Sequence, residues 1–548
     1  MANSFRKSDC INDVNDGIKD LYHDSVAEVV PQPPNTPPDG SYDEHDKKDM
    51  HRMGKKQELR LMCNARNFRR MSTLSFTSLI MASWEFVLIS NLYGLIDGGL
   101  AGLFWSFLWT AIGFGFVIAS LAEMASMAPT SGGQYHWVSE FAPPQHQKFL
   151  SYIVGWVSTL SWQAGTASGS FLTGTIIQGM ITVNNPDYVP QNWHGTLLIF
   201  SMVIILYVAN TWTAEWLPDI QNVLMIFHIF GFLAVVVVLW ILGPHPPARA
   251  VFFEFQDFGG WSSIGLSLMV GRISAIFCLI CSDSAAHMSE EVKNAGIVVP
   301  RSMMWSYMIN GTLGFITLTT LLFSIPDVEA AIDDPTGYPF LWVFQQSMPT
   351  RGTNALTIIV LVLVIASNIS FNASTSRQTY AFARDKGLPF SDWIAHVHPK
   401  LKIPANSVAL TCLITVLLSL INLGSYEAFN AIISLQLVAL MFSYVMSIGC
   451  VLVKRIQDPK SLPDARWSLG RTGPAINTIA ICYALFTFFW CFWPIEAAVT
   501  PETFNWAVLI FVATLIWSLI MYFVSGRKVC DGPVISVEGF LAERRLFA

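Results

Sequence analysis

The sequence predicts an all-α membrane protein with about twelve transmembrane helices. Three observations support this fold class. Of the 548 residues, 53% are hydrophobic and only 13% are charged, whereas soluble domains carry about 25% charged residues. The apolar residues also gather into long stretches, and about 20 in succession are needed to cross a bilayer as a helix.

Apolar segments follow one another along the chain, separated by polar loops. They lie at residues 72–93, 98–124, 149–181, 195–212, 219–243, 263–287, 302–325, 353–375, 406–422, 428–453, 474–496 and 504–525. The third is longer than a bilayer requires and contains Gly165, Gly169 and Gly174, so we expect it to be kinked or tilted. An even number of spans places both termini on one side of the membrane.

Polar tails flank the helical domain, which we place at residues 71–526. Residues 1–70 are charged, contain the proline-rich run 31–38 and lack an apolar face. They are therefore predicted to form a disordered tail. Residues 527–548 form the second tail. The beginning of the chain does not resemble a signal peptide, because no hydrophobic core follows a short basic stretch.

Lysine and arginine residues indicate the orientation. With both tails in the cytosol, all of the 32 Lys and Arg residues except Arg249, Arg351 and Arg272 fall in tails or cytosolic loops. The positive-inside rule predicts this bias. We expect a multi-pass protein with cytosolic termini, in the plasma membrane or alternatively the vacuolar membrane. Arg272 falls inside the sixth segment, where it either stands near an outer mouth or, as we favour, snorkels to the outer interface.

Several function classes lack their residue patterns. The net charge of −6 and the lack of a basic block argue against a nucleic-acid partner. The sequence has no Walker motif, HExxH motif or nucleophile motif, so we expect neither ATP hydrolysis nor an enzyme, and we assign no catalytic residue. The nine cysteines have no metal-ligand spacing, and we expect no metal and no cofactor.

Two acidic residues stand in apolar helices, where acids are costly. Glu85 lies near the middle of the first segment and follows Ala82, Ser83 and Trp84. A carboxyl group at this depth either faces a polar cavity and has a function, or it is a structural group that is protonated or paired with another helix.

The sixth segment repeats this pattern. Its apolar run ends at Cys281, and Ser282 and Asp283 follow. Polar interruptions at corresponding positions of two halves are typical of a midplane binding site between inverted repeats. The candidate repeats span residues 72–243 and 263–453, and residues 474–525 add two helices.

Weaker candidates lie in other segments. His228 in the fifth segment is either a packing residue or a proton relay. Asn368 and Asn372 belong to a polar stripe in the eighth segment, where small polar residues either hold membrane helices together or line a site. Gln163 in the third segment is a further lining candidate.

Four stretches resemble motifs of fungal amino-acid/choline permeases, which belong to the amino acid-polyamine-organocation superfamily. They are Trp84-Glu85 with Asp97-GGLAGLFW, Ser120-LAEMASMAPTSGGQYHWVSEFAPP, Asp283-SAAHMSEEVKNAGIVVPRSM and Ser376-RQTYAFARDKGLP. The stretches extend from about residue 75 to about residue 390. Members that resemble this chain include GABA permeases and choline transporters.

This resemblance implies a five-plus-five inverted-repeat fold with broken first and sixth helices, two further helices, and alternating access around a midplane site. The implied substrate-binding residues are Ala82, Ser83, Trp84, Glu85, Cys281, Ser282 and Asp283. The implied proton-coupling residues are Asp283, at an often acidic position, and His228, six residues after Asn222. The first break lacks the glycines of many amino acid permeases, and Trp84 and Glu85 suit an ammonium group.

We therefore expect secondary transport of a small amine solute, namely an amino acid, GABA, choline or a related amine, coupled to protons. The expected partners are this solute, H+ and the lipid bilayer. A non-transporting nutrient sensor on the same fold and an exporter of an amine metabolite are the alternatives.

Overall fold

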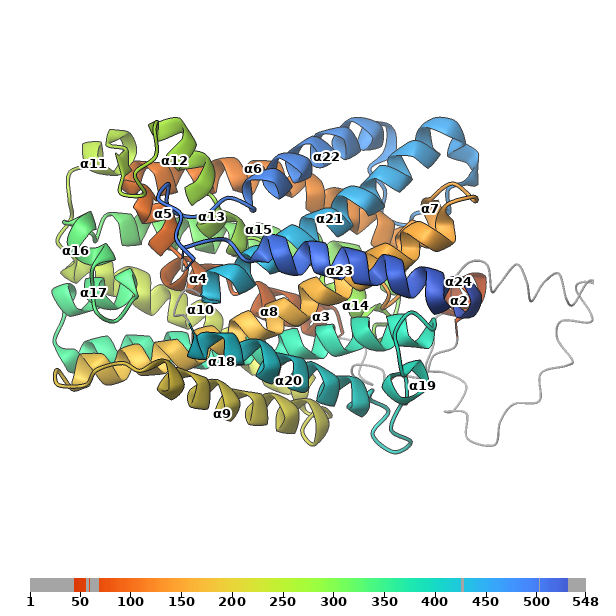
Figure 1. The fold of residues 1–548 in the computed structure, drawn as a ribbon, viewed down its shortest axis with the longest axis horizontal. Helices are drawn as coiled ribbons and strands as arrows, with labels where there is room; N and C mark the ends of the chain where they lie inside the picture. The colour runs from red at the N-terminus through yellow and green to blue at the C-terminus, as the bar shows by residue number, and fades with distance from the viewer. Residues whose placement is uncertain (1–43, 56–58, 60–68, 425–427, 502, 531–548) are drawn as a thin grey trace, which may run out of the picture. The chain divides into compact units, whose positions relative to one another are not determined.

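The computed structural model describes residues 44–55, 59, 69–424, 428–501 and 503–530. Most of the predicted N-terminal tail and most of the C-terminal tail lie outside these residues. Figure 1 shows a bundle of long helices, with α2 and α24 at one end. We call this end the termini face, and the end with α11, α16 and α17 the opposite face.

Within the described residues, nine spans are long and apolar enough to cross a membrane. They are formed by α3 (Arg69–Met81) with α4 (Ser83–Ile89), α6 (Gly99–Met127), α9 (Asn192–Thr211), α10 (Leu217–Leu242), α18 (Thr350–Arg384), α20 (Ala405–Ser419) with η2 (Leu420–Leu423), α21 (Ala428–Gln457), η4 (Gly470–Thr472) with α22 (Gly473–Trp490), and α23 (Ala507–Met521) with η5 (Tyr522–Gly526) and α24 (Arg527–Val529). Each coincides with a predicted segment.

The other three predicted segments are helical too. α8 (Gln147–Asn184) and α15 (Ala295–Leu322) are long helices, and α8 is continuous over 38 residues. Their many small and polar residues lower their hydropathy. The sixth segment is broken into α12 (Ile264–Gly271), α13 (Ile273–Phe277) and α14 (Ser284–His287). The number of twelve spans therefore stays a prediction, although the structure has helices in every predicted segment.

Short elements form the ends of the bundle. On or near the termini face are α2 (Glu44–Arg52), α7 (Gln134–Phe141), η1 (Ser289–Glu291), α19 (Ser391–Ile394) and η3 (Pro459–Ser461). The opposite face has α5 (Leu92–Ile96), α11 (Ala248–Phe253), α16 (Val328–Ile332) and α17 (Pro339–Ser347). There β1 (Asp97–Gly98) and β2 (Gln256–Asp257) pair antiparallel, with Asp97 opposite Asp257.

The outer surface of the bundle is apolar. On α10, Ile226, Phe227 and Phe230 are 57–65% exposed, and α23 likewise presents large apolar side chains. A soluble monomer rarely exposes continuous apolar surface of this kind, so these side chains face lipid.

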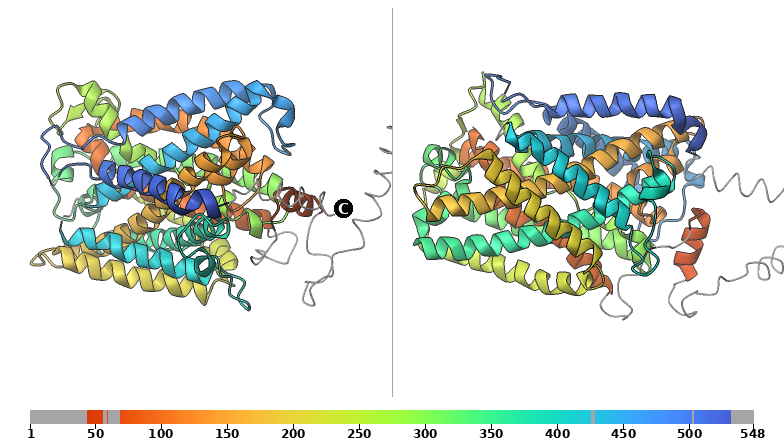
Figure 2. Two further views of the ribbon diagram at one scale, coloured as in Figure 1. Left: turned by 45° about the vertical axis from the view of Figure 1, so that its right-hand side comes forward. Right: turned by 60° about the horizontal axis from the view of Figure 1, so that its bottom comes forward.

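The core forms where the long helices cross. α8 packs against α18 and α21, and α6 packs against α15 and α22. Both views of Figure 2 show α8 running through the bundle among these helices. The first span, α3 and α4, lies against α10, α15 and α18, so its side chains meet other helices on several sides and are almost completely buried.

One helix lies inside the segment that the sequence predicts to be a disordered tail. α2 packs on the termini face through charged contacts: Arg52 pairs with Glu140, and Asp46 accepts hydrogen bonds from the backbone N–H groups of Asn294 and Ala295. Those two groups begin α15, where a carboxylate suits the orphan donors of a helix N-terminus.

Candidate functional site

The first and sixth spans are each broken by one residue in the left-handed region. Ala82 has φ 39° between α3 and α4, and Cys281 has φ 74° just before α14. Neither residue is a glycine, so each break carries a backbone cost that the surrounding packing must offset. Beyond the first break, the backbone N–H of Ser83 donates to Asn310 Oδ1 of α15 at 3.3 Å.

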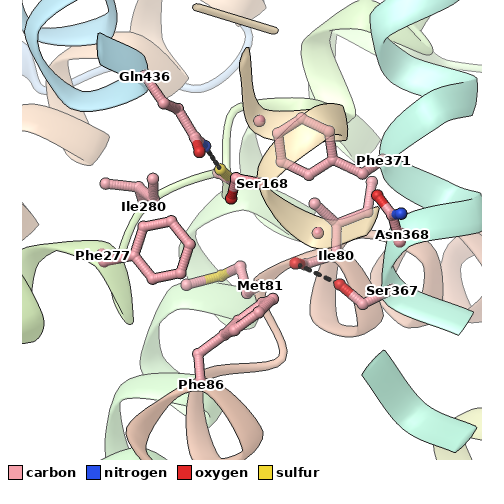
Figure 3. Close-up of a pocket in the computed structure, with 13 residues that line it drawn as sticks. Ile80, Met81, Phe86, Ser168, Phe277, Ile280, Ser367, Asn368, Phe371 and Gln436 are labelled. Carbon is pink, nitrogen blue, oxygen red and sulfur yellow. Dashed lines mark hydrogen bonds between the residues drawn. The ribbon is translucent and has the colours of Figure 1, made fainter. Parts of the chain in front are cut away.

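A cavity lies where the two breaks meet α8, α18 and α21 (Figure 3). It comprises about 350 Å³ of empty space, including the part open to solvent. Its lining residues are Ile80, Met81, Phe86, Gly165, Ser168, Gly169, Phe277, Ile280, Cys281, Ser367, Asn368, Phe371 and Gln436. The lining combines three phenyl rings with neutral polar groups and contains no charged side chain.

Two glycines of α8 make room for this cavity. A Cβ atom on Gly165 would lie 2.3 Å from the ring of Phe371 and 2.9 Å from Gln436 Nε2. A Cβ atom on Gly169 would lie 2.5 Å from the side-chain amide of Asn368. These distances are shorter than any ordinary contact, so a side chain at either position would displace the groups that line the cavity.

Unpartnered polar atoms belong to residues of the same wall. Gln436 donates through Nε2 to Cys281 Sγ at 3.6 Å, a contact drawn in Figure 3. Its Oε1 is buried without a protein partner, and so is the hydroxyl of Ser168. Buried polar groups without partners are costly, and a polar solute that entered the cavity would supply the missing hydrogen bonds.

Glu85 and Trp84 lie beside the cavity and meet His228 of α10. His228 Nδ1 is 2.7 Å from Glu85 Oε1 and 3.1 Å from Trp84 Nε1. All three side chains are fully buried. One ring nitrogen cannot accept from the indole and donate to the carboxylate at once, so the position of a single proton decides which contact is formed.

Asp283 is held toward the termini face of the cavity. Its Oδ2 accepts a hydrogen bond from Gln134 Nε2 of α7 at 2.6 Å, and its Oδ1 has no protein partner. Ser282 is buried next to it, with its hydroxyl also unpartnered. Asp283 therefore contacts α7, the short helix before the third span, and is not among the residues that line the cavity.

The three lining candidates have different surroundings. Asn368 lines the cavity. Gln163 donates to Thr379 and Thr411 at 3.0 and 3.1 Å, which holds α8 to α18 and α20. Asn372 lies near Cys412 at 4.0 Å, again between α18 and α20. The latter two act as contacts between helices in this structure.

Sequence reasoning missed most of the wall. Of its predicted substrate residues, Cys281 lines the cavity, whereas Ala82, Ser83, Trp84, Glu85, Ser282 and Asp283 do not. The missed residues include Phe86 and Phe277, which flank the breaks and pack edge to face with ring centroids 5.3 Å apart. Gly165 and Gly169 were noted only as kink positions, although glycines four residues apart share one helix face.

The position of the Arg272 side chain differs from the prediction. The sequence predicts that Arg272 snorkels to the outer interface, but the side chain is only 1% exposed and lies among residues of α22. Packing against a neighbouring helix, which hydropathy does not reveal, retains the guanidinium inside the bundle.

Ion pairs join the segment after the sixth span to the end of α18 on the termini face. Arg384 binds both oxygens of Glu290 at 2.7 and 2.8 Å, and Arg377 donates to Glu291 at 2.8 Å. Burial raises the pKa of Glu290, but Arg384 more than offsets this effect, so the net pKa is lowered and the carboxylate stays charged. Among the described residues, no group of His, Cys, Asp and Glu side chains is arranged to hold a metal ion.

A bundle of membrane-spanning helices, with two broken helices meeting at a cavity, is typical of membrane transporters. The chain belongs to the amino acid permease family, whose sequence profile matches residues 69–515. The resemblance seen in the sequence is thereby confirmed, and the chain is a transporter-family protein and not an enzyme.

Individual relatives agree with this assignment. Amino-acid permease 2 of Neurospora crassa is 28% identical, over 86% of this chain and 86% of its own. The choline transporter of Saccharomyces cerevisiae is 25% identical, over 81% of this chain and 79% of its own. Among solved structures, the Eremococcus coleocola manganese transporter matches with a TM-score of 0.52 at 12% identity, over 86% of this chain and 98% of its own. This structural match confirms the predicted fold class.

Proposed function

We propose that the protein is a proton-coupled secondary transporter that carries a small amine solute, such as an amino acid, GABA or choline, by alternating access. The cavity between the broken first and sixth helices carries this proposal. It lies deep in the bundle, it is small, and its wall offers unpartnered hydrogen-bonding atoms. Two of the relatives, an amino-acid permease and a choline transporter, support the amine class.

The wall suits the two ends of such a solute. The rings of Phe86, Phe277 and Phe371 offer π faces to an ammonium group and apolar contact to a carbon chain. Gln436 Oε1 and Ser168 Oγ accept hydrogen bonds from N–H or O–H donors. At the two breaks, backbone groups that are not bonded within a helix would face the solute. Cys281 would contact the solute directly.

Proton coupling is assigned to Glu85 and His228. The proton between them is either on His228 Nδ1, which then donates to Glu85, or on Glu85, which then donates to His228. Both groups lie next to the first-helix break, so a change in their charge acts on the segment that forms the cavity. Asp283, held by Gln134 on the termini side, is a second candidate for the coupled proton.

The decisive experiment is uptake by proteoliposomes that contain the full chain. A radiolabelled panel of amino acids, GABA, choline and polyamines would be tested with and without an inward proton gradient. Two external pH values on either side of the histidine titration range are needed. We expect saturable uptake of at least one amine, accelerated by the gradient. Ligand binding without flux would contradict transport and favour a sensor.

Variants of the pair test the coupling. Glu85→Gln and His228→Gln keep hydrogen-bonding ability and remove the ionisable group, so we expect the response of uptake to the gradient to fall tenfold or more, about 1.4 kcal/mol. Exchange of solute without a gradient should persist. Asp187→Asn, an exposed loop acid, is the matched control. A full gradient response in both variants would refute this assignment.

A further inference from the structure

Arg272 is a buried cation whose charge the described part of the chain does not balance. It stands at the junction of α12 and α13, and its side chain is 1% exposed. An arginine side chain is not deprotonated in proteins, so the guanidinium cannot escape burial by becoming neutral. A buried charge that is neither paired nor fully hydrogen-bonded is strongly unfavourable.

The contacts of Arg272 satisfy only part of its donors. Nη2 donates to Thr487 Oγ1 of α22 at 3.2 Å. The guanidinium carbon lies 4.5 Å from the ring centroid of Phe486 and 5.9 Å from that of Tyr483. Nε and Nη1, which together carry three of the five N–H donors of a guanidinium, have no protein partner.

The nearby acids Asp97 and Asp257 on the opposite face do not balance the charge of Arg272. Asp97 accepts from the indole N–H of Trp261 at 3.0 Å, and Asp257 accepts from the hydroxyl of Ser267 at 3.1 Å. Within the described residues, neither carboxylate forms an ion pair with Arg272. The hydroxyl of Tyr483 is a further buried donor without a protein partner.

We propose that Arg272, with Thr487 and Tyr483, forms an anion-binding site between α13 and α22. The ligand is a small monoanionic group, either a free halide or the carboxylate of a solute. Arg272 precedes Phe277 of the cavity wall by five residues, about 7.5 Å along a helix, so the anion binds on the opposite-face side of the cavity. Binding of a free halide would be independent of the proposed transport function, whereas binding of a solute carboxylate rests on that function.

The first test measures thermal unfolding of the purified full chain, with chloride replaced by gluconate at constant ionic strength. A halide site predicts a saturable rise of the unfolding midpoint with chloride, as expected for a ligand that binds the native state. Arg272→Gln should abolish this rise, and Arg272→Lys should keep part of it, because charge remains without the planar fork. Arg249→Gln, an exposed arginine beside Glu254, should leave it unchanged.

The second test separates the two sources by uptake in proteoliposomes. If the anion is a solute carboxylate, chloride has no effect, while Arg272→Gln and Thr487→Val lower uptake of amino acids tenfold or more and spare choline, which has no carboxylate. Tyr483→Phe, which removes only the hydroxyl, should lower amino-acid uptake and spare choline in the same way. The proposal is overturned if wild-type protein ignores chloride and Thr487→Val, which retains the charge, changes amino-acid and choline uptake equally.

Discussion

Asp97 is a buried carboxyl group next to a second acid. It is 1% exposed, and its pKa is raised to about 8, with burial as the largest cause. The charge of Asp257 also raises this pKa, while hydrogen bonds from Trp261 and Ser267 lower it in part. The protonated form therefore suits the folded protein at neutral pH, and the strand pair β1–β2 carries a site that titrates near pH 8.

Folding stability should follow from this shift. The folded pKa lies above the unfolded value of 3.8, so the folded state binds the proton more tightly. The contribution is complete below the unfolded pKa and is lost as pH rises through about 8, on the order of a few kcal/mol. Thermal unfolding of wild-type protein should therefore show lower midpoints at pH 8 than at pH 5 in detergent.

Asp97→Asn checks the origin of this trend. The amide keeps an acceptor for the indole N–H of Trp261 and cannot ionise, so the decline between pH 5 and pH 8 should largely disappear. The exposed Asp187→Asn should retain the wild-type slope. An unchanged slope in Asp97→Asn would show that other groups cause the trend.

Gly165 illustrates how one absent side chain shapes the cavity. Gly165→Ala would place Cβ 2.3 Å from the Phe371 ring and 2.9 Å from Gln436 Nε2. We expect the KM for the solute to rise tenfold or more, about 1.4 kcal/mol, because the wall must move inward. Gly449→Ala on α21, where Cβ meets no atom within 4 Å, should transport normally. Equal KM values for the two variants would contradict the wall assignment.

At the scale of elements, the break in the sixth span depends on one left-handed residue. Cys281 has φ 74°, a conformation that glycine adopts freely and β-branched residues strongly avoid. Cys281→Gly should therefore keep the unfolding midpoint or raise it slightly, with an effect of about 1 kcal/mol or less. Cys281→Val should lower it clearly, by about 1–3 kcal/mol.

Calorimetry of the folded, purified variants measures these unfolding midpoints. Cys278→Val, three residues earlier and in the right-handed region at φ −73°, is the control for volume and should be milder than Cys281→Val. If both valine variants had the same midpoint, backbone strain would not explain the break.

At the scale of the whole molecule, the segment after α2 ties the termini face together. Lys55 pairs with Asp385 at the end of α18, and Tyr135 of α7 donates to the same carboxylate at 3.0 Å. Burial raises the pKa of Asp385, but Lys55 and Arg384 lower it more, so the net pKa is depressed. Arg466, before α22, donates to Asp49 of α2 at 3.1 Å.

Loss of the Lys55–Asp385 ion pair should lower the local stability of the termini face. In Lys55→Ala and in Asp385→Asn, we expect faster backbone hydrogen exchange in α7, by tenfold or more, since a partly buried ion pair is broken. The double variant should add little, because both changes remove one interaction. Lys386→Ala removes an exposed lysine that pairs with Asp392 and should exchange like wild type. Additive effects would argue against a shared contact.

Hydropathy and charge predicted the parts of the fold that the bilayer imposes. The first and sixth predicted segments are helices broken by a left-handed residue, and within the described residues the other ten of the twelve lack such a break. Helices form throughout because a lipid-embedded chain must satisfy its backbone groups internally. Polar interruptions after Ala82 and before Asp283 marked the two broken helices. Within the tail predicted to be disordered, however, α2 forms a helix, since its stability comes from distant partners such as Glu140 and Asn294 and not from its own apolar face.

The sequence by itself determined the membrane class, the family and the two breaks, because these depend on local composition and motif. Tertiary structure alone decided what each polar group does. It paired Glu85 with His228, directed Asp283 to Gln134, and left Arg272 among the aromatic rings of α22. It also built the cavity wall from Gly165, Phe371 and Gln436, which are far apart in sequence. Such contacts are set by how helices pack, and packing geometry is not encoded in any single segment.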